Sequence, residues 1–252
     1  MAEELGGTTP AVPAGGPGPA GGGLTVLAVT GIGEIRPGDD LAGLLARRAP
    51  LVDGDVLVVT QKVVSKAEGR LVPVDVDDPA ARRRLVEAES VRILRRRGDL
   101  LITETRHGFV CANAGIDLSN VAEGWAALLP EDADRSARRI RDALRARAGV
   151  EVAVVVSDTF GRTWRRGVTD IAIGCAGIAA VVDLRGTTDA LGRKLVATEV
   201  CVADELAGAA ELVMGKATGI PAAIVRGVDR SWLRRGSVAE EIVRPPGEDL
   251  FR

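Results

Sequence analysis

Two short segments of the chain carry a carboxylate beside hydroxyl or amide groups, a combination that suits binding of a divalent cation. The first is Ser157-Asp158-Thr159, which follows the apolar run from Val152 to Val156 and precedes several arginines. A carboxylate beside a hydroxyl at a strand end can hold a hard cation such as Mg²⁺ or Mn²⁺, and nearby arginines can neutralise phosphate oxygens. The alternative from this motif alone is an Asp-Thr turn that caps the next segment.

The second segment, Asn113 to Asn120, contains Asp117 and also follows a predicted strand. Its small residues would let the backbone and a metal-bound phosphate approach each other closely. Together the two segments predict a Mg²⁺ or Mn²⁺ site that works with phosphates and without histidine. The composition agrees with this prediction. The chain has a single histidine, His107, which excludes a metal site built from several histidines and leaves no second histidine for catalysis, and it has no tyrosine.

Lysine is rare in this chain. The 33 basic residues include only four lysines: Lys62, Lys66, Lys194 and Lys216. A lysine kept where arginine is otherwise used suggests a need for a compact charge, for example against a phosphate. Lys62 and Lys66 directly follow a buried strand, which suits anion binding at the edge of a sheet; chance retention is the open alternative.

The elements that would position these groups follow from hydrophobic patterning and helix caps. Predicted strands cover Leu24 to Val29, Val56 to Val59, Leu100 to Thr105, Phe109 to Ala112, Val152 to Val156 and Ala222 to Arg226. Predicted helices run from a cap at Asp39 or Asp40 to Ala46, from Asp78 to about Arg97, from Asp134 to Ala148 and from Glu199 to Lys216, with a polar loop from Ser157 to Asp170. Because this order lacks a regular β-α-β alternation, it predicts an irregular mixed-sheet α+β fold.

Two nucleotide-binding signatures come close and fail. Gly31-Ile32-Gly33 follows a strand, but Arg36 replaces the third glycine of a dinucleotide fingerprint and Pro37-Gly38 prevents a helix from starting there. Gly215-Lys216-Ala217-Thr218 resembles part of a P-loop, but it ends a predicted helix instead of beginning one. The sequence therefore predicts neither a Rossmann site nor a P-loop.

The global composition limits the classes of partner. The net charge is −2, and no apolar run approaches the roughly 20 residues of a membrane span, so we expect a cytoplasmic protein with small-molecule partners and no membrane or nucleic-acid partner. The wide spacing of Cys111, Cys175 and Cys201 favours buried free thiols over a disulfide or a zinc site.

Residues 1–23 hold eight glycines and four prolines and are predicted to be a disordered tail, with one folded domain over residues 24–252.

Deleting residues 1–23 is expected to leave the activity and the unfolding temperature of the rest of the chain unchanged, because this composition offers little to pack. A turnover assay on the shortened chain checks this expectation. Loss of activity in a chain that stays folded would contradict it.

Four segments together resemble the coenzyme F420-0:L-glutamate ligase family, with the motifs in the expected order from about Leu24 onward. The segments are Val58 to Arg70, Asn113 to Asn120, Ser157 to Arg162 and Val202 to Glu205. The resemblance implies a GTP-dependent and Mg²⁺- or Mn²⁺-dependent ligase that adds γ-linked glutamate to the deazaflavin coenzyme. It also implies an α+β fold and an intertwined homodimer.

Site residues carry over from the resemblance motif by motif. The resemblance implies metal ligation by Asp117, Asp158 and Thr159, with catalytic roles for Asp117, Asp158 and Lys66. It implies nucleotide contacts for the turn Ile32, Gly33, Glu34 and Ile35, for Gln61, Lys62, Lys66 and Asn120, and for the loop that begins with Met214, Gly215 and Lys216. Lys216 stands where the family can have an acidic or amide residue that helps to hold metal.

The implied reaction needs no protein nucleophile. GTP would phosphorylate the terminal carboxylate of the coenzyme precursor, and the glutamate amine would attack the acyl phosphate; two metal ions could bridge the phosphates through Asp117 and Asp158. Two other hypotheses stay open. The arginine-rich helices could form a nucleotide- or RNA-binding module, or the chain could be the ligase half of a bifunctional enzyme that carries a flavin-binding domain elsewhere.

Overall fold

The computed structural model describes residues 23–251, so the tail predicted over residues 1–23 lies outside the described residues except for Gly23. The helices are α1 (Leu41–Arg48), α2 (Gln61–Ala67), α3 (Pro79–Ala88), α4 (Ala133–Ala148), α5 (Val202–Met214) and α6 (Val238–Glu241), with 3-10 turns at Asn113–Gly115, Arg230–Trp232 and Pro246–Glu248. The strands are β1 (Thr25–Val29), β2 (Val56–Thr60), β3 (Leu71–Pro73), β4 (Ser90–Arg97), β5 (Leu100–Thr105), β6 (Val110–Ala112), β7 (Trp125–Ala127), β8 (Ala153–Arg162), β9 (Arg165–Ala176), β10 (Val182–Asp183), β11 (Glu199–Val200) and β12 (Ala222–Arg226).

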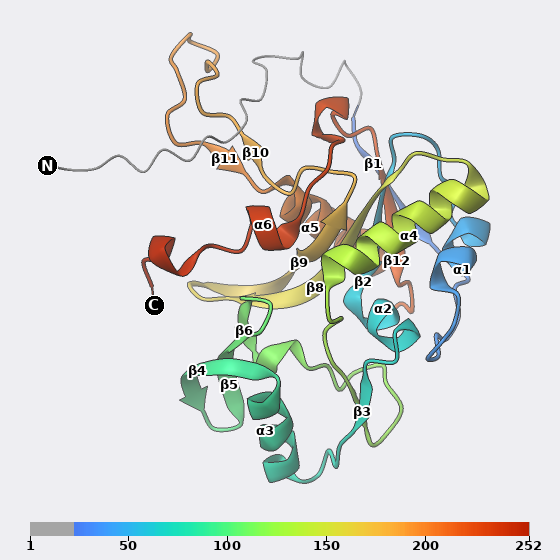
Figure 1. Ribbon diagram of the computed structural model, residues 1–252, viewed down its shortest axis with the longest axis vertical. Helices are drawn as coiled ribbons and strands as arrows, with labels where there is room; N and C mark the ends of the chain where they lie inside the picture. Colours follow the sequence, from blue (N-terminus) through green and yellow to red (C-terminus); the bar gives the residue numbers. More distant parts are fainter. Residues whose placement is uncertain (1–22, 252) are drawn as a thin grey trace, which may run out of the picture.

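A five-stranded sheet in the order β1-β12-β2-β8-β9 forms the centre of the molecule (Figure 1). Only β2 and β8 run parallel, and the other neighbours are antiparallel. Three small sheets, β10-β11, β3-β7 and β4-β5-β6, lie outside it. The predicted mixed α+β fold is confirmed.

Helices cover both faces of the central sheet, which explains why its strands are apolar throughout. Leu57 and Val59 pack with residues of α1 and α4 in one core, while Val56 and Val58 pack with α5 in a second. All four side chains are fully buried, as expected for a strand covered on both sides. In Figure 1, α4 crosses one face of the sheet and α5 lies on the other.

The small sheet β4-β5-β6 corrects one prediction from the sequence. The helix predicted from Asp78 to about Arg97 ends at Ala88, and Ser90–Arg97 instead forms β4, which pairs with β5. The β-branched Val91 and Ile93 favour the strand, and Gly98-Asp99 is the two-residue turn of a hairpin. Helix α3 keeps the predicted start, with Asp78 accepting from the backbone N–H of Ala80 at 2.8 Å.

The polar loop predicted from Ser157 to Asp170 is also wrong. These residues form the long hairpin of β8 and β9, which projects from the central sheet in Figure 1. The partner strand satisfies the backbone, so polar side chains can occupy a regular strand. Ser157-Asp158-Thr159 therefore lies inside a strand instead of at its end.

The remaining elements agree closely with the sequence. Helices α1 and α4 begin after side-chain caps at Asp40 and Asp132. Helix α5 is shorter than the predicted Glu199 to Lys216, because Glu199 and Val200 pair with β10. Among residues 23–251, we find no helix with the length and apolar character to cross a membrane.

Candidate active site

The candidate site lies where the parallel strands β2 and β8 stop pairing. Thr60 and Ser157 form the last pair of this ladder. Beyond it, the chain after β2 turns directly into α2, while β8 continues toward its hairpin turn. Gln61 and Lys62 follow β2, and Asp158 follows the last paired residue within β8. They therefore lie at one edge of the parallel pair, the usual position of ligands in mixed α/β sheets.

Lys62 reaches from α2 to the segment that carries Asp117. Its Nζ lies 2.7 Å from Oδ2 of Asp117 and donates to Oγ of Ser119 at 2.9 Å. Ser119 donates its backbone N–H and its hydroxyl to Oδ1 of Asp117, at 2.7 and 2.8 Å. Burial acts to raise the pKa of Asp117, but the hydrogen bonds from Lys62 and Ser119 outweigh it and hold the pKa below its usual value. Asp117 is therefore ionised and fixed in place.

Lys66 connects the end of α2 to the turn that contains Glu34. Its ammonium pairs with Oε1 of Glu34, and its side chain is only 7% exposed while that of Glu34 is 71% exposed. The structure thus brings together two predicted nucleotide-contacting segments. The ammonium of Lys66 is therefore buried, and its ion-pair partner Glu34 is exposed to solvent.

Asp158 is a carboxylate in a strongly negative environment. Burial raises its pKa to about 7; the backbone N–H of Thr159 opposes the rise, and the neighbouring charges of Asp117 and Asp170 increase it. Among residues 23–251, the hydrogen-bond donor to Asp158 is this N–H, at 2.8 Å from Oδ1. The site around Asp158 therefore has more negative charge than its neighbours balance.

Asp170 and Glu211 belong to the site and were missed by sequence reasoning. Asp170 lies opposite Thr159 in the hairpin, and its Oδ1 accepts a hydrogen bond of 2.7 Å from the hydroxyl of Thr159. Lys216 pairs with both carboxylates. Asp170 fell inside the predicted loop, because the hairpin turn at Thr163-Trp164 lacks the Asn-Gly or Asp-Gly signal. No local sequence signal marks Asp170 or Glu211, because their pairing depends on the β8-β9 register and on the direction of α5.

Other predicted contact residues have side chains committed to the interior. Gln61 donates to Oγ of Ser65 at 2.7 Å and to the carbonyl of Leu128 at 3.0 Å. The side chains of Ile32, Ile35 and Met214 are buried in the two cores. Such residues can offer only backbone groups to a nucleotide. Three positions lie in positive-φ turns where the backbone is accessible: Gly33, Asn120 and Gly215.

The buried carboxylate of Asp134 and the half-buried carboxylate of Asp204 support the strands that carry the site. Asp204 of α5 accepts the backbone N–H of Ala172 at 2.9 Å, beside an irregularity of the β8-β9 ladder. Asp134 of α4 accepts four hydrogen bonds, from the backbone N–H groups of Cys175, Val238 and Ala239 and from the hydroxyl of Ser237. They tie β9 to α5, α4 and α6.

The predicted free thiols are confirmed, and they are unreactive. Cys111 and Cys175 are buried and Cys201 is half-buried, all unpaired. Burial raises the pKa of the Cys111 and Cys201 thiols to about 12 and that of Cys175 well above its usual value. The thiolate is the reactive form, so none of the three is poised as a nucleophile.

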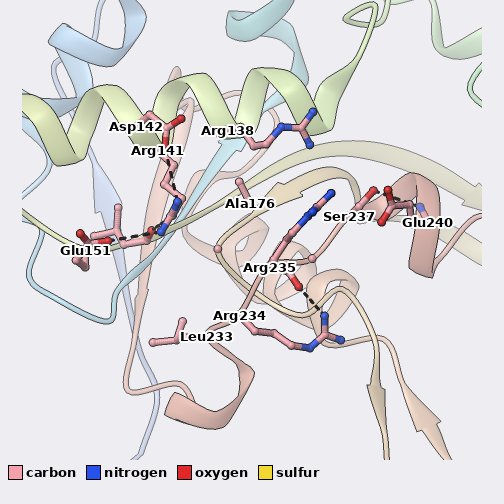
Figure 2. Close-up of a pocket in the computed structure, with 13 residues that line it drawn as sticks. Arg138, Arg141, Asp142, Glu151, Ala176, Leu233, Arg234, Arg235, Ser237 and Glu240 are labelled. Carbon is pink, nitrogen blue, oxygen red and sulfur yellow. Dashed lines mark hydrogen bonds and ion pairs between the residues drawn. The ribbon is translucent and has the colours of Figure 1, made fainter. Parts of the chain in front are cut away.

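A cleft of about 540 Å³ lies elsewhere, between α4 and residues 233–240 (Figure 2). Val152 and Ala176 line it, so it lies at the end of β8 remote from Asp158. Arg141 there donates to the carbonyl of Val152 at 3.1 Å and pairs with Glu151. None of the predicted site residues lines this cleft. A smaller hollow of about 230 Å³ adjoins Asp117, because Ile116 and Leu118 line it.

The donor chemistry at Asp158 fits a hard divalent cation. Carboxylate and hydroxyl oxygens are the groups that Mg²⁺ and Mn²⁺ prefer, and the pKa of Asp158 is raised first by burial and then by the charges of Asp117 and Asp170. Within residues 23–251, no three His, Cys, Asp or Glu side chains gather closely enough to hold a metal by themselves.

Comparison with known proteins now adds to the geometry. A family model described as F420-0:Gamma-glutamyl ligase matches residues 31–227, most of the described chain. The chain belongs to this family. The match spans the candidate site from Gly31 through Lys216. Membership identifies the protein as a ligase.

Curated relatives of the ligase family resemble the chain over most of its length. A protein of Methanopyrus kandleri is 47% identical over 87% of this chain and 94% of its own length, and one of Methanothermobacter thermautotrophicus is 43% identical over 91% and 99%. A protein of Archaeoglobus fulgidus is 42% identical over 91% of this chain and 96% of its own. All three carry the name Coenzyme F420:L-glutamate ligase.

Proposed function

We propose that this family member joins L-glutamate through a γ-linked amide to the terminal carboxylate of coenzyme F420-0, with GTP as the source of energy. The observation that carries the proposal is the gathering of charged groups beyond the last pair of the β2-β8 ladder, where Lys62 pairs with Asp117 and the charges of Asp117 and Lys216 both act on Asp158. Family membership supports the acceptor and the amino acid. We further propose that the enzyme acts as a cytoplasmic homodimer on small molecules.

The reaction needs activation because a free carboxylate does not form an amide at a useful rate. We propose that a carboxylate oxygen of the coenzyme attacks the γ-phosphorus of GTP, the bond to the bridging oxygen breaks and GDP leaves. The glutamate amine then attacks the acyl carbon, loses a proton, and inorganic phosphate departs with one oxygen of the original carboxylate. Lys62 and Lys66 would hold the phosphates, because compact ammonium groups suit phosphate oxygens.

Asp158 and Asp117 would hold a Mg²⁺ or Mn²⁺ ion together with the nucleotide phosphates. Such an ion neutralises the negative charge that develops on the transferring phosphoryl group. Asp117 is already ionised and fixed by Ser119. The backbone N–H of Thr159 orients Asp158. These residues therefore need little rearrangement to present oxygens to a cation.

Oxygen-18 in the carboxylate of the coenzyme precursor tests this chemistry. After one round of ligation with GTP and glutamate, one labelled oxygen should appear in the inorganic phosphate, as measured by mass spectrometry. Unlabelled phosphate beside a ligated product would contradict the acyl-phosphate route. ATP in place of GTP, in the same assay, tests the choice of nucleotide.

Lys66→Ala is expected to weaken GTP binding by about 10- to 100-fold, because a charge-assisted hydrogen bond contributes roughly 1.5–3 kcal/mol. The fold should persist, since Glu34 is exposed and can be solvated when its partner is lost. Calorimetric titration of GDP measures the change. Lys194→Ala is the matched control, because Lys194 is an exposed lysine in the segment that connects β10 to β11. Equal affinity in the Lys66 variant and the wild type would remove Lys66 from the phosphate site.

A further inference from the structure

The ammonium of Lys216 lies among three oxygen ligands. Its Nζ is 2.7 Å from Oδ1 of Asp170 and 3.1 Å from Oε1 of Glu211, and it donates to the hydroxyl of Thr159. An ammonium has three donors and no acceptor, so these oxygens use its full bonding capacity. Partial burial opposes the charge, but the hydrogen bonds to Asp170 and Glu211 raise the pKa of Lys216 above its usual value.

Separate elements build this arrangement. Thr159 comes from β8, Asp170 from β9 and Glu211 from α5. The side chain of Asp170 is only 2% exposed, and the hydroxyl of Ser157 donates to its other oxygen at 3.2 Å. Lys216 enters from the turn after α5, where Gly215 has a positive φ of 62°. The buried carboxylate of Asp170 is fixed by hydrogen bonds from Ser157 and Thr159 before it meets Lys216. The ion pair is therefore part of a preformed cation site and not an incidental pair on the surface.

Two carboxylates and a hydroxyl around one point are also the ligands that a divalent ion would take. Here a lysine that is part of the chain holds that point. Asp158, which is next to Thr159, has no such ammonium partner among the described residues, although the charge of Lys216 is close enough to lower its pKa. The site therefore contains one position for a bound cation and one that the chain fills itself.

We propose that Lys216 supplies the second cation of the active site, so that each chain binds one divalent ion with the nucleotide instead of two. This inference rests on the proposed function only in assuming that a divalent ion binds beside Asp158. It replaces the expectation of two metal ions drawn from the sequence. In this proposal the hydroxyl of Thr159 accepts a hydrogen bond from Lys216, and the backbone carbonyl oxygen of Thr159 is the atom that would bind the metal ion.

Counting Mn²⁺ tests the proposal directly. The electron paramagnetic resonance signal of free Mn²⁺, followed as the ion is titrated into protein saturated with GDP, gives the number bound per chain. We expect one ion in the wild type and two in Lys216→Gln, because the carboxylates of Asp170 and Glu211 become available. The double variant Lys216→Gln with Glu211→Gln should return to one. Lys194→Gln is the matched control and should stay at one.

Each outcome bears on the proposal. Two ions in the wild type with ligation intact would overturn the inference and leave the proposed function standing, and this count needs no variant to fold. A single ion in Lys216→Gln that unfolds like the wild type would also overturn it. No Mn²⁺ bound and no ligation in the wild type would overturn the proposed function, and this inference with it.

Discussion

Asp158→Asn is expected to lower the rate of ligation by roughly 10³-fold. A metal ion stabilises the transferring phosphoryl group by several kcal/mol, and each 1.4 kcal/mol or so is a tenfold change in rate. Asparagine keeps the shape of the side chain and the hydrogen bond from Thr159, but it removes the full charge that a divalent ion needs. Steady-state turnover at saturating GTP and glutamate measures the effect.

The same variant should fold normally, which separates a metal ligand from a structural residue. Burial and the charges of Asp117 and Asp170 raise the pKa of Asp158 to about 7. A raised carboxyl pKa means that ionisation above pH 7 costs the folded state stability, and asparagine removes that cost. The unfolding temperature at pH 8 should therefore be equal or higher. Near-normal turnover would show that Asp158 does not hold the metal ion, and Asp77→Asn, at an exposed position, is the control.

Asp134→Ala is expected to reduce the free energy of unfolding by about 3–5 kcal/mol. The carboxylate is 5% exposed and accepts hydrogen bonds from Cys175, Ser237, Val238 and Ala239. Its removal leaves these buried donors without an acceptor, at about 1–3 kcal/mol for each unsatisfied group, partly relieved by local movement. This is a large share of the stability of a typical domain.

Urea unfolding measures the loss in Asp134→Ala. Asp142→Ala, on the exposed face of the same helix α4, is the matched control and should change stability by about 0.5 kcal/mol or less. A loss below about 1 kcal/mol in Asp134→Ala would show that the donors find other partners. The tie between α4, β9 and α6 would then contribute little to the fold.

The fold was predictable where local signals and burial agree. The run Val56 to Val59 is apolar on both faces, and the helix predicted from Asp134 to Ala148 matches α4 except that α4 begins one residue earlier. The segment from Ser90 to Arg97 was misread because its arginines continue the charge pattern of α3. Pairing with β5 decides its conformation, and that pairing is a tertiary property, although Gly98-Asp99 was a usable turn signal.

The candidate site was predictable in its individual groups but not in their pairings. The rarity of lysine singled out four residues, and the structure brings Lys62, Lys66 and Lys216 against carboxylates, whereas Lys194 is exposed. Nothing in the local sequence marks Asp170 or Glu211, because their role depends on the β8-β9 register and on the direction of α5. Hydrophobic periodicity predicts individual helices and strands, whereas this site forms from side chains of different elements, namely β8, β9 and α5.

The most direct test of the account is the mass of the product. Purified protein with GTP, Mn²⁺, L-glutamate and coenzyme F420-0 should yield a coenzyme that is heavier by one or more glutamyl residues, and reactions without GTP or glutamate should leave the mass unchanged. Hydrolysis of the product with a peptidase specific for α-linked glutamate should not release the added residue. An unchanged coenzyme mass in the complete reaction, with protein that is folded and binds GDP, would contradict the account.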